Sequence, residues 1–101
     1  MAARVPRRQV RRLLSLLFAR YWAARAKYAP AIAQAEQLQA VSPDSPYIDR
    51  LLYLAAGCEI RRGRKDRALA TLHSLLKDYP GSPLVPQVKK DIESLEGGKN
   101  E

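Results

Sequence analysis

The chain has 101 residues, of which 47% are hydrophobic, and a formal net charge of +8. This length accommodates one domain with a modest core, and the hydrophobic content excludes a chain that is disordered throughout. No run approaches the roughly 18 consecutive apolar residues of a membrane-spanning helix, and a single cysteine, Cys58, excludes an internal disulfide.

The basic excess lies entirely at the start of the chain. Residues 1–28 contain no acidic side chain and eight basic ones: Arg4, Arg7, Arg8, Arg11, Arg12, Arg20, Arg25 and Lys27. The remaining residues hold ten basic and ten acidic side chains, so they are neutral as a group. Residues 1–7 include Pro6 and have no periodic pattern, which predicts a flexible basic arm.

A helix is predicted from about Arg8 to Ala26. Apolar residues recur there at spacings of three and four, which indicates a core-facing stripe. The stripe consists of Val10, Leu13, Leu14, Leu17, Tyr21 and Ala24. Phe18 and Trp22, one turn apart, form a second apolar strip, so we expect this helix to bury two sides.

The same segment has some features of a secretory leader, because a basic start precedes the apolar residues 13–19 and the small-x-small triplet 24–26. Arg20, however, ends the apolar run at its minimum length, and Arg25 lies inside the triplet. We therefore favour the amphipathic helix.

A second helix is predicted from Pro30 to about Val41, with proline in its first turn. Its core face comprises Ala31, Ile32, Ala35, Leu38 and Val41. A third helix is predicted from about Pro46 to Arg62, with Ser45 as its N-cap and Gly63 as the residue that ends it.

The last two helices are predicted over residues 65–78 and 83–96. Ala68, Leu69, Leu72, Leu75, Leu76 and Tyr79 form the core face of the fourth, and Val85, Val88, Ile92 and Leu95 form that of the fifth. Residues 97–101, Gly-Gly-Lys-Asn-Glu, are predicted to be a disordered tail.

The chain contains an internal repeat with a period of 37 residues. Ser-Pro-Asp-Ser-Pro-Tyr-Ile at 42–48 returns as Tyr-Pro-Gly-Ser-Pro-Leu-Val at 79–85, and Ala31 corresponds to Ala68. A period in the thirties with helical patterns between the echoes is typical of helix-pair solenoids. We therefore predict an all-α fold of about five helices, a short right-handed α-solenoid of antiparallel helix pairs. Its repeat domain spans 8–96, with repeats at about 8–44 and 45–81 and a capping helix at 83–96.

No residue pattern supports catalysis. His73 is the only histidine and has no ligand partner at metal-binding spacing, and the serines lack a nucleophile-elbow motif. Cys58, within an Ala-Ala-Gly run, is interpreted as a small buried hydrophobic residue. We predict that the chain is not an enzyme and has no catalytic or metal-binding residues, no cofactor and no small-molecule substrate.

The second repeat resembles a tetratricopeptide repeat (TPR). With Pro80 as its terminal proline, Leu75, Leu72, Ala68 and Gly63 fall on the small and large slots of the pattern, and Leu52 and Glu59 replace its Trp and Tyr. The Pro-x-Ser-Pro turns and Ala19-Arg-Tyr-Trp are similar to bacterial envelope repeat proteins of the BamD (outer-membrane assembly lipoprotein) and CpoB (Tol-Pal coordinator) type. The resemblance implies the periplasm or the periplasmic face of the outer membrane. A chain that is complete without a leader would be cytoplasmic.

These patterns predict a protein-protein interaction module, and the resemblance implies a scaffold in bacterial outer-membrane protein assembly. We expect a protein or peptide partner to bind the concave first-helix surface through Tyr21, Trp22, Arg25, Tyr47, Arg50 and Tyr53. An alternative is that the basic N-terminal segment binds nucleic acid, which we rank low, or another anionic surface. A further alternative is a homo-oligomer that pairs through the Phe18–Trp22 strip.

Overall fold

The structure, a computed structural model, describes the backbone of residues 7–97 and the side chains of residues 13–97. Residues 1–6 of the predicted arm and residues 98–101 of the predicted tail lie outside the described residues. Over the described range the chain forms five helices and no strand. The helices are α1 (Arg7–Ala24), α2 (Tyr28–Val41), α3 (Ile48–Arg61), α4 (Lys65–Asp78) and α5 (Val85–Gly97).

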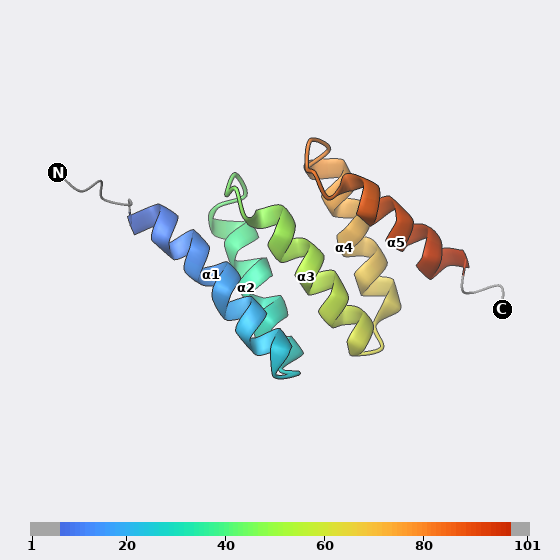
Figure 1. The fold of residues 1–101 in the computed structure, drawn as a ribbon, viewed down its shortest axis with the longest axis horizontal. Helices are drawn as coiled ribbons and strands as arrows, with labels where there is room; N and C mark the ends of the chain where they lie inside the picture. Colours follow the sequence, from blue (N-terminus) through green and yellow to red (C-terminus); the bar gives the residue numbers. More distant parts are fainter. Residues whose placement is uncertain (1–6, 98–101) are drawn as a thin grey trace.

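The five helices follow one another as an antiparallel stack (Figure 1). α1 packs against α2 and also touches α3, α3 packs against both α2 and α4, and α4 packs against α5. In the view of Figure 1, α1, α3 and α5 lie in the nearer layer and α2 and α4 lie behind them. The fold is therefore a short α-solenoid of helix pairs, as predicted.

The two turns inside the helix pairs have the same backbone conformation. Each uses one residue with a positive φ, Ala26 (60°) after α1 and Gly63 (77°) after α3. In each, the following N–H reaches back to a carbonyl five residues earlier, as in a Schellman motif. The two bonds are Lys27 N–H to Trp22 O and Arg64 N–H to Glu59 O, both 2.8 Å. All of these positions are related by the period of 37, so the sequence repeat is a structural repeat at these turns.

The two turns between helix pairs also match, and they correct the predicted cap. α3 begins at Ile48, and Ser45 is not its N-cap, because Pro46 and Tyr47 form a turn between them. The Ser45 Oγ instead accepts a bond from the Tyr47 N–H at 3.2 Å inside that turn. At the equivalent place Ser82 Oγ accepts from the Leu84 N–H at 3.1 Å.

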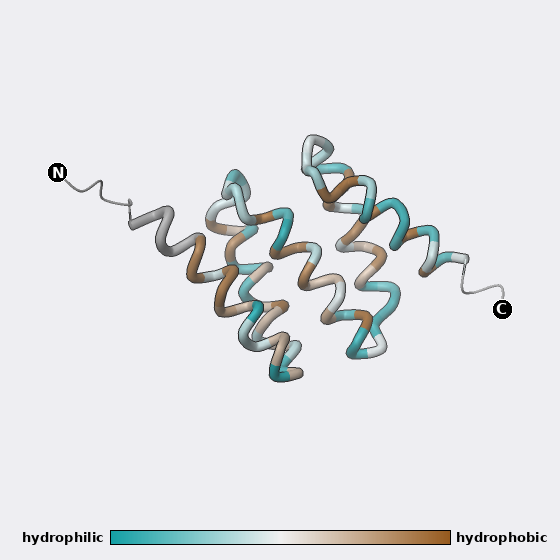
Figure 2. The backbone as a smooth tube through the Cα atoms, viewed as in Figure 1, coloured by the Kyte–Doolittle hydropathy of each residue, from teal (hydrophilic) through white to brown (hydrophobic). Residues whose placement is uncertain are grey.

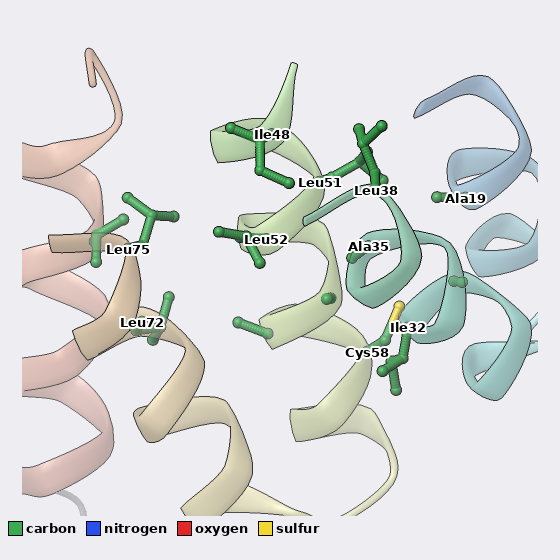
Figure 3. Packing of buried hydrophobic residues seen from close by; sticks show 14 of the residues in the cluster. Ala19, Ile32, Ala35, Leu38, Ile48, Leu51, Leu52, Cys58, Leu72 and Leu75 are labelled. Atoms are coloured by element: carbon green, nitrogen blue, oxygen red, sulfur yellow. The ribbon is translucent and has the colours of Figure 1, made fainter. Parts of the chain in front are cut away.

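The core consists of small and branched aliphatic residues between the two layers. The repeat-equivalent Ala31 and Ala68 are 1% and 0% exposed, which allows close approach of the helix backbones at both places. Figure 3 shows Ile32 of α2 beside Cys58 of α3, with Leu38 near Leu51. The buried hydrophobic residues other than Ala68 form one cluster from α1 to α5, so the stack has a single core.

The predicted core stripe of the first helix is wrong. Leu16 and Ala19 are the buried residues of α1, at 6% and 0% exposure. The stripe residues with described side chains are instead exposed: Leu13, Leu14, Leu17, Tyr21 and Ala24. The reason is that, among the described residues, α1 packs only against α2 and α3, which lie on one side of it. Val41 was also predicted to be core and is 71% exposed, because it is the last residue of α2.

Candidate interaction surface

One face of α1 exposes five large apolar side chains, which we call the α1 strip. Each is 40–50% exposed, and the set is Leu13, Leu14, Leu17, Phe18 and Tyr21. Their spacing of three and four residues places them on one side of an 18-residue helix. Figure 2 shows the hydrophobic residues of this part of α1. A contiguous exposed apolar patch of this kind is typical of an interaction site.

The repeat explains why three of these five positions are apolar. Adding 37 to Leu14, Phe18 and Tyr21 gives three residues of α3 that are 0–5% exposed: Leu51, Ala55 and Cys58. In α3 this face is covered by the preceding helix, α2, against which α3 packs. The α1 strip therefore lies at the position where, one repeat later, another helix covers the surface.

An aromatic and basic cluster lies at the C-terminal end of the strip. The Tyr21 and Trp22 rings meet edge to face, with centroids 5.2 Å apart and an interplanar angle of 78°. The Arg25 guanidinium carbon lies 4.6 Å from the centroid of the Tyr21 ring, a cation-π contact. Trp22 is half-buried, whereas Tyr21 and Arg25 are exposed. Three of the six predicted site residues therefore meet at one place.

Two other predicted residues, Arg50 and Tyr53, line a groove between α1 and α3. Two adjoining hollows of about 300 and 490 Å³ form this groove, and both are bordered by Arg20, Tyr53 and Leu54. The Tyr53 hydroxyl donates a hydrogen bond to an Asp91 carboxylate oxygen on α5. The pKa of Tyr53 is raised to about 12, mainly by burial and secondly by this hydrogen bond. The groove thus combines a neutral phenol with three arginines, Arg20, Arg50 and Arg61.

The sixth predicted residue lies apart from both groups. Tyr47 is half-buried and packs against the core in the turn before α3. The structure therefore does not bring the six residues together. The predicted site also omitted Leu13, Leu14 and Leu17 of the strip, whereas Phe18 was predicted only as a contact between copies of the chain. Leu14 and Phe18 correspond to the buried Leu51 and Ala55 of α3, with no helix pair before them in the described range, and this correspondence is the signal that identifies the strip.

Metal binding and membrane spanning have no support among the described residues. No group of three or more His, Cys, Asp or Glu side chains within them is placed to hold a metal ion. His73 Nε2 lies 3.8 Å from Glu96 Oε2, and both side chains are more than half exposed. None of the helices between residues 7 and 97 has the length and apolar character needed to cross a membrane.

Comparison with known protein families finds a match for one segment of the chain. A family model of the tetratricopeptide repeat matches residues 50–82, which cover most of α3, all of α4 and the following turn. No curated protein and no solved structure matches the chain. Residues 50–82 are thus similar to a tetratricopeptide repeat, and repeats of this family generally mediate protein-protein interactions.

Proposed function

We propose that the chain is a non-catalytic protein-protein interaction module whose main contact surface is the α1 strip. The observation that carries this proposal is the exposure of five large apolar side chains, four of which correspond to buried or half-buried residues of α3: Leu51, Leu54, Ala55 and Cys58. A helix supplies the cover in α3, so a helix of the partner is the expected cover for α1. Burial of several Leu, Phe and Tyr side chains would then drive binding.

The charge around the strip indicates the chemistry of that partner helix. Residues 1–28 carry no acidic side chain, and Arg20 and Arg25, both exposed, lie close to the strip on α1. A second copy of the chain would place two such acid-free segments against each other, which like-charge repulsion disfavours. The expected partner is therefore an amphipathic helix whose apolar face is bordered by Asp or Glu.

The α1–α3 groove provides a second contact in this proposal. Arg50 and Tyr53 line it, and Arg20 lies both at its edge and beside the strip. A partner segment that leaves the strip would reach Arg50 by crossing α1. The resemblance to bacterial envelope repeat proteins supports a scaffold role in outer-membrane protein assembly, in the periplasm. We propose Tyr21, Trp22, Arg25, Arg50 and Tyr53 as contact residues of these two surfaces, and Tyr47 as a separate contact in the turn before α3.

Two synthetic helices test the proposal. Both carry leucine at positions i, i+3, i+4 and i+7, and the remaining positions are mostly glutamate in one and mostly lysine in the other. We expect the acidic helix to bind, and to bind more weakly as salt rises, whereas the basic helix does not bind. Equal binding of both helices, or binding of neither, would contradict the proposed partner chemistry.

Matched variants locate the binding. Leu17→Ser combined with Phe18→Ser removes two strip residues that are 48% and 50% exposed, and should weaken the acidic helix by tenfold or more. Val41→Ser, at a 71% exposed position on α2, is the control and should change nothing. Sedimentation of the chain alone should give a monomer. A dimer that the double variant dissociates would make a second copy the occupant. Binding of the chain to anionic vesicles in preference to the peptide would favour the alternative of an anionic surface.

A further inference from the structure

A further hollow, apart from the α1–α3 groove, lies between α2, α3 and α4. Its volume is about 310 Å³, and it is lined by side chains of α2, α3 and α4. Glu59 of α3 borders it and is only 4% exposed. One of its carboxylate oxygens, Oε2, is buried without a hydrogen-bond partner among the described residues. A buried acceptor without a protein donor is uncommon, and such a group can accept a hydrogen bond from a bound ligand.

The repeat shows what stands at the equivalent place. One period later, the position of Glu59 is occupied by Glu96 of α5, and the position of Glu36 is occupied by His73 of α4. In that later copy the two side chains face each other, with His73 Nε2 3.8 Å from Glu96 Oε2. In the earlier copy both positions are carboxylates, and both line the hollow. The hollow therefore has two acids where the next repeat has an acid and a nitrogen donor.

We propose that this hollow, the Glu59 hollow, binds a guanidinium or primary ammonium group, as carried by an arginine or lysine side chain. Such a group has several N–H donors and a positive charge, which together match a buried carboxylate and a second one at the rim. Thr71, Ser74 and Gln39 line the same hollow, and their side chains carry oxygens that can act as further acceptors. The site does not depend on the α1 strip, which lies on a different face.

The residues present favour an organic cation over a metal ion. The hollow holds only two carboxylates, and Arg67 also borders it, so a divalent ion would meet too few anionic ligands and one positive charge. Arg67 is exposed. The absence of a hydrogen-bond partner on Glu59 Oε2 shows that the Arg67 guanidinium does not bind this oxygen. The positive charge of Arg67 repels an incoming cation, so removing this charge should strengthen binding of the cation.

Nuclear magnetic resonance titration of the full chain tests the site. The probes are a Gly-Arg-Gly peptide blocked at both ends, the same peptide with citrulline in place of arginine, and methylguanidinium. We expect the arginine peptide and methylguanidinium to shift the methyl signals of Ala35, Ala55 and Ala70, which line the hollow. Citrulline lacks the charge and should cause no shift. Tighter binding of the peptide identifies a polypeptide side chain as the ligand, and equal binding identifies a free cation.

Variants decide whether the carboxylate is responsible. Glu59→Gln keeps the shape and should lower the affinity for the arginine peptide by about tenfold or more, since a charge-assisted bond is lost. Glu96→Gln removes the same charge from the exposed equivalent position on α5 and should have no effect. Arg67→Ala should strengthen binding. Absent shifts, equal shifts with citrulline, unchanged affinity in Glu59→Gln, or loss of binding in Arg67→Ala would each overturn the proposal.

Discussion

Ala26 and Gly63 occupy equivalent turn positions with a positive φ. Replacing Ala26 by glycine and Gly63 by alanine should change the stability of the fold in opposite directions. Ala26 has a φ of 60°, in the left-handed region that a Cβ disfavours by about 1–2 kcal/mol. Glycine at this position removes that strain. Its greater conformational freedom in the unfolded chain lowers the resulting gain in stability by about 0.5–1 kcal/mol. We expect Ala26→Gly to raise the free energy of unfolding by about 0.5–1 kcal/mol.

Gly63→Ala should lower the free energy of unfolding by a similar amount, about 0.5–1 kcal/mol. An added Cβ at Gly63 meets no atom within 4 Å, so the expected loss comes from its φ of 77° and not from a steric clash. Gly57 is the matched control, because a Cβ there also meets nothing within 4 Å but the residue lies inside α3. Gly57→Ala should therefore stabilise by about 0.5–1 kcal/mol.

Urea unfolding followed by far-ultraviolet circular dichroism measures all three variants. For a domain of this size each 1 kcal/mol corresponds to roughly 4–8 °C in Tm, so thermal unfolding gives an independent reading. The reasoning fails if Gly63→Ala and Gly57→Ala shift stability in the same direction. It also fails if Ala26→Gly destabilises the chain, since the two turns would then not be equivalent.

Three further predictions follow from single contacts. The pKa of Tyr53 is raised from 10.0 to about 12 by burial and by Asp91. Since the phenol ionises less readily in the folded chain than in the unfolded chain, the free energy of unfolding should fall between pH 10 and pH 12. Asp91→Asn should bring the spectroscopic pKa of Tyr53 closer to 10.0, and an unchanged value would refute the contact. Ser82→Ala should destabilise by about 1–2 kcal/mol in urea unfolding, because the Ser82 hydroxyl donates to an Asp49 carboxylate oxygen at 2.6 Å and accepts from the Leu84 N–H. Leu51→Ala, at 0% exposure, should destabilise by about 2–5 kcal/mol, whereas Phe18→Ala, at 50% exposure, should change stability by less than about 1 kcal/mol; similar losses would contradict the exposure of the strip.

Local signals in the sequence were sufficient for the helices and their order. α4 spans Lys65–Asp78 as predicted, because a glycine precedes it and a Tyr-Pro-Gly turn follows it. The Ser45 cap was wrong because a serine before a proline is equally suited to a turn that precedes the helix, and the Ser45 Oγ bond to Tyr47 N–H serves that turn. Propensity alone does not distinguish these two roles.

The interaction surface was harder to predict because helical periodicity identifies an apolar face without identifying its neighbour. Leu14 and Leu51 have the same spacing pattern in the sequence, yet one is 42% exposed and the other 0%. The difference depends on whether a helix precedes each one in the stack. Glu59 shows the reverse case, since a charged residue is normally predicted to be at the surface, but it is covered when α4 packs against α3.

The most direct test of the account is to locate a bound acidic amphipathic helix by nuclear magnetic resonance shift mapping on the full chain. The account predicts that the largest perturbations fall on Leu13, Leu14, Leu17 and Phe18 of α1, with smaller ones at Arg50 and Tyr53 in the groove. Perturbations that avoid α1, or that persist unchanged when Leu17 and Phe18 are both replaced by serine, would contradict it.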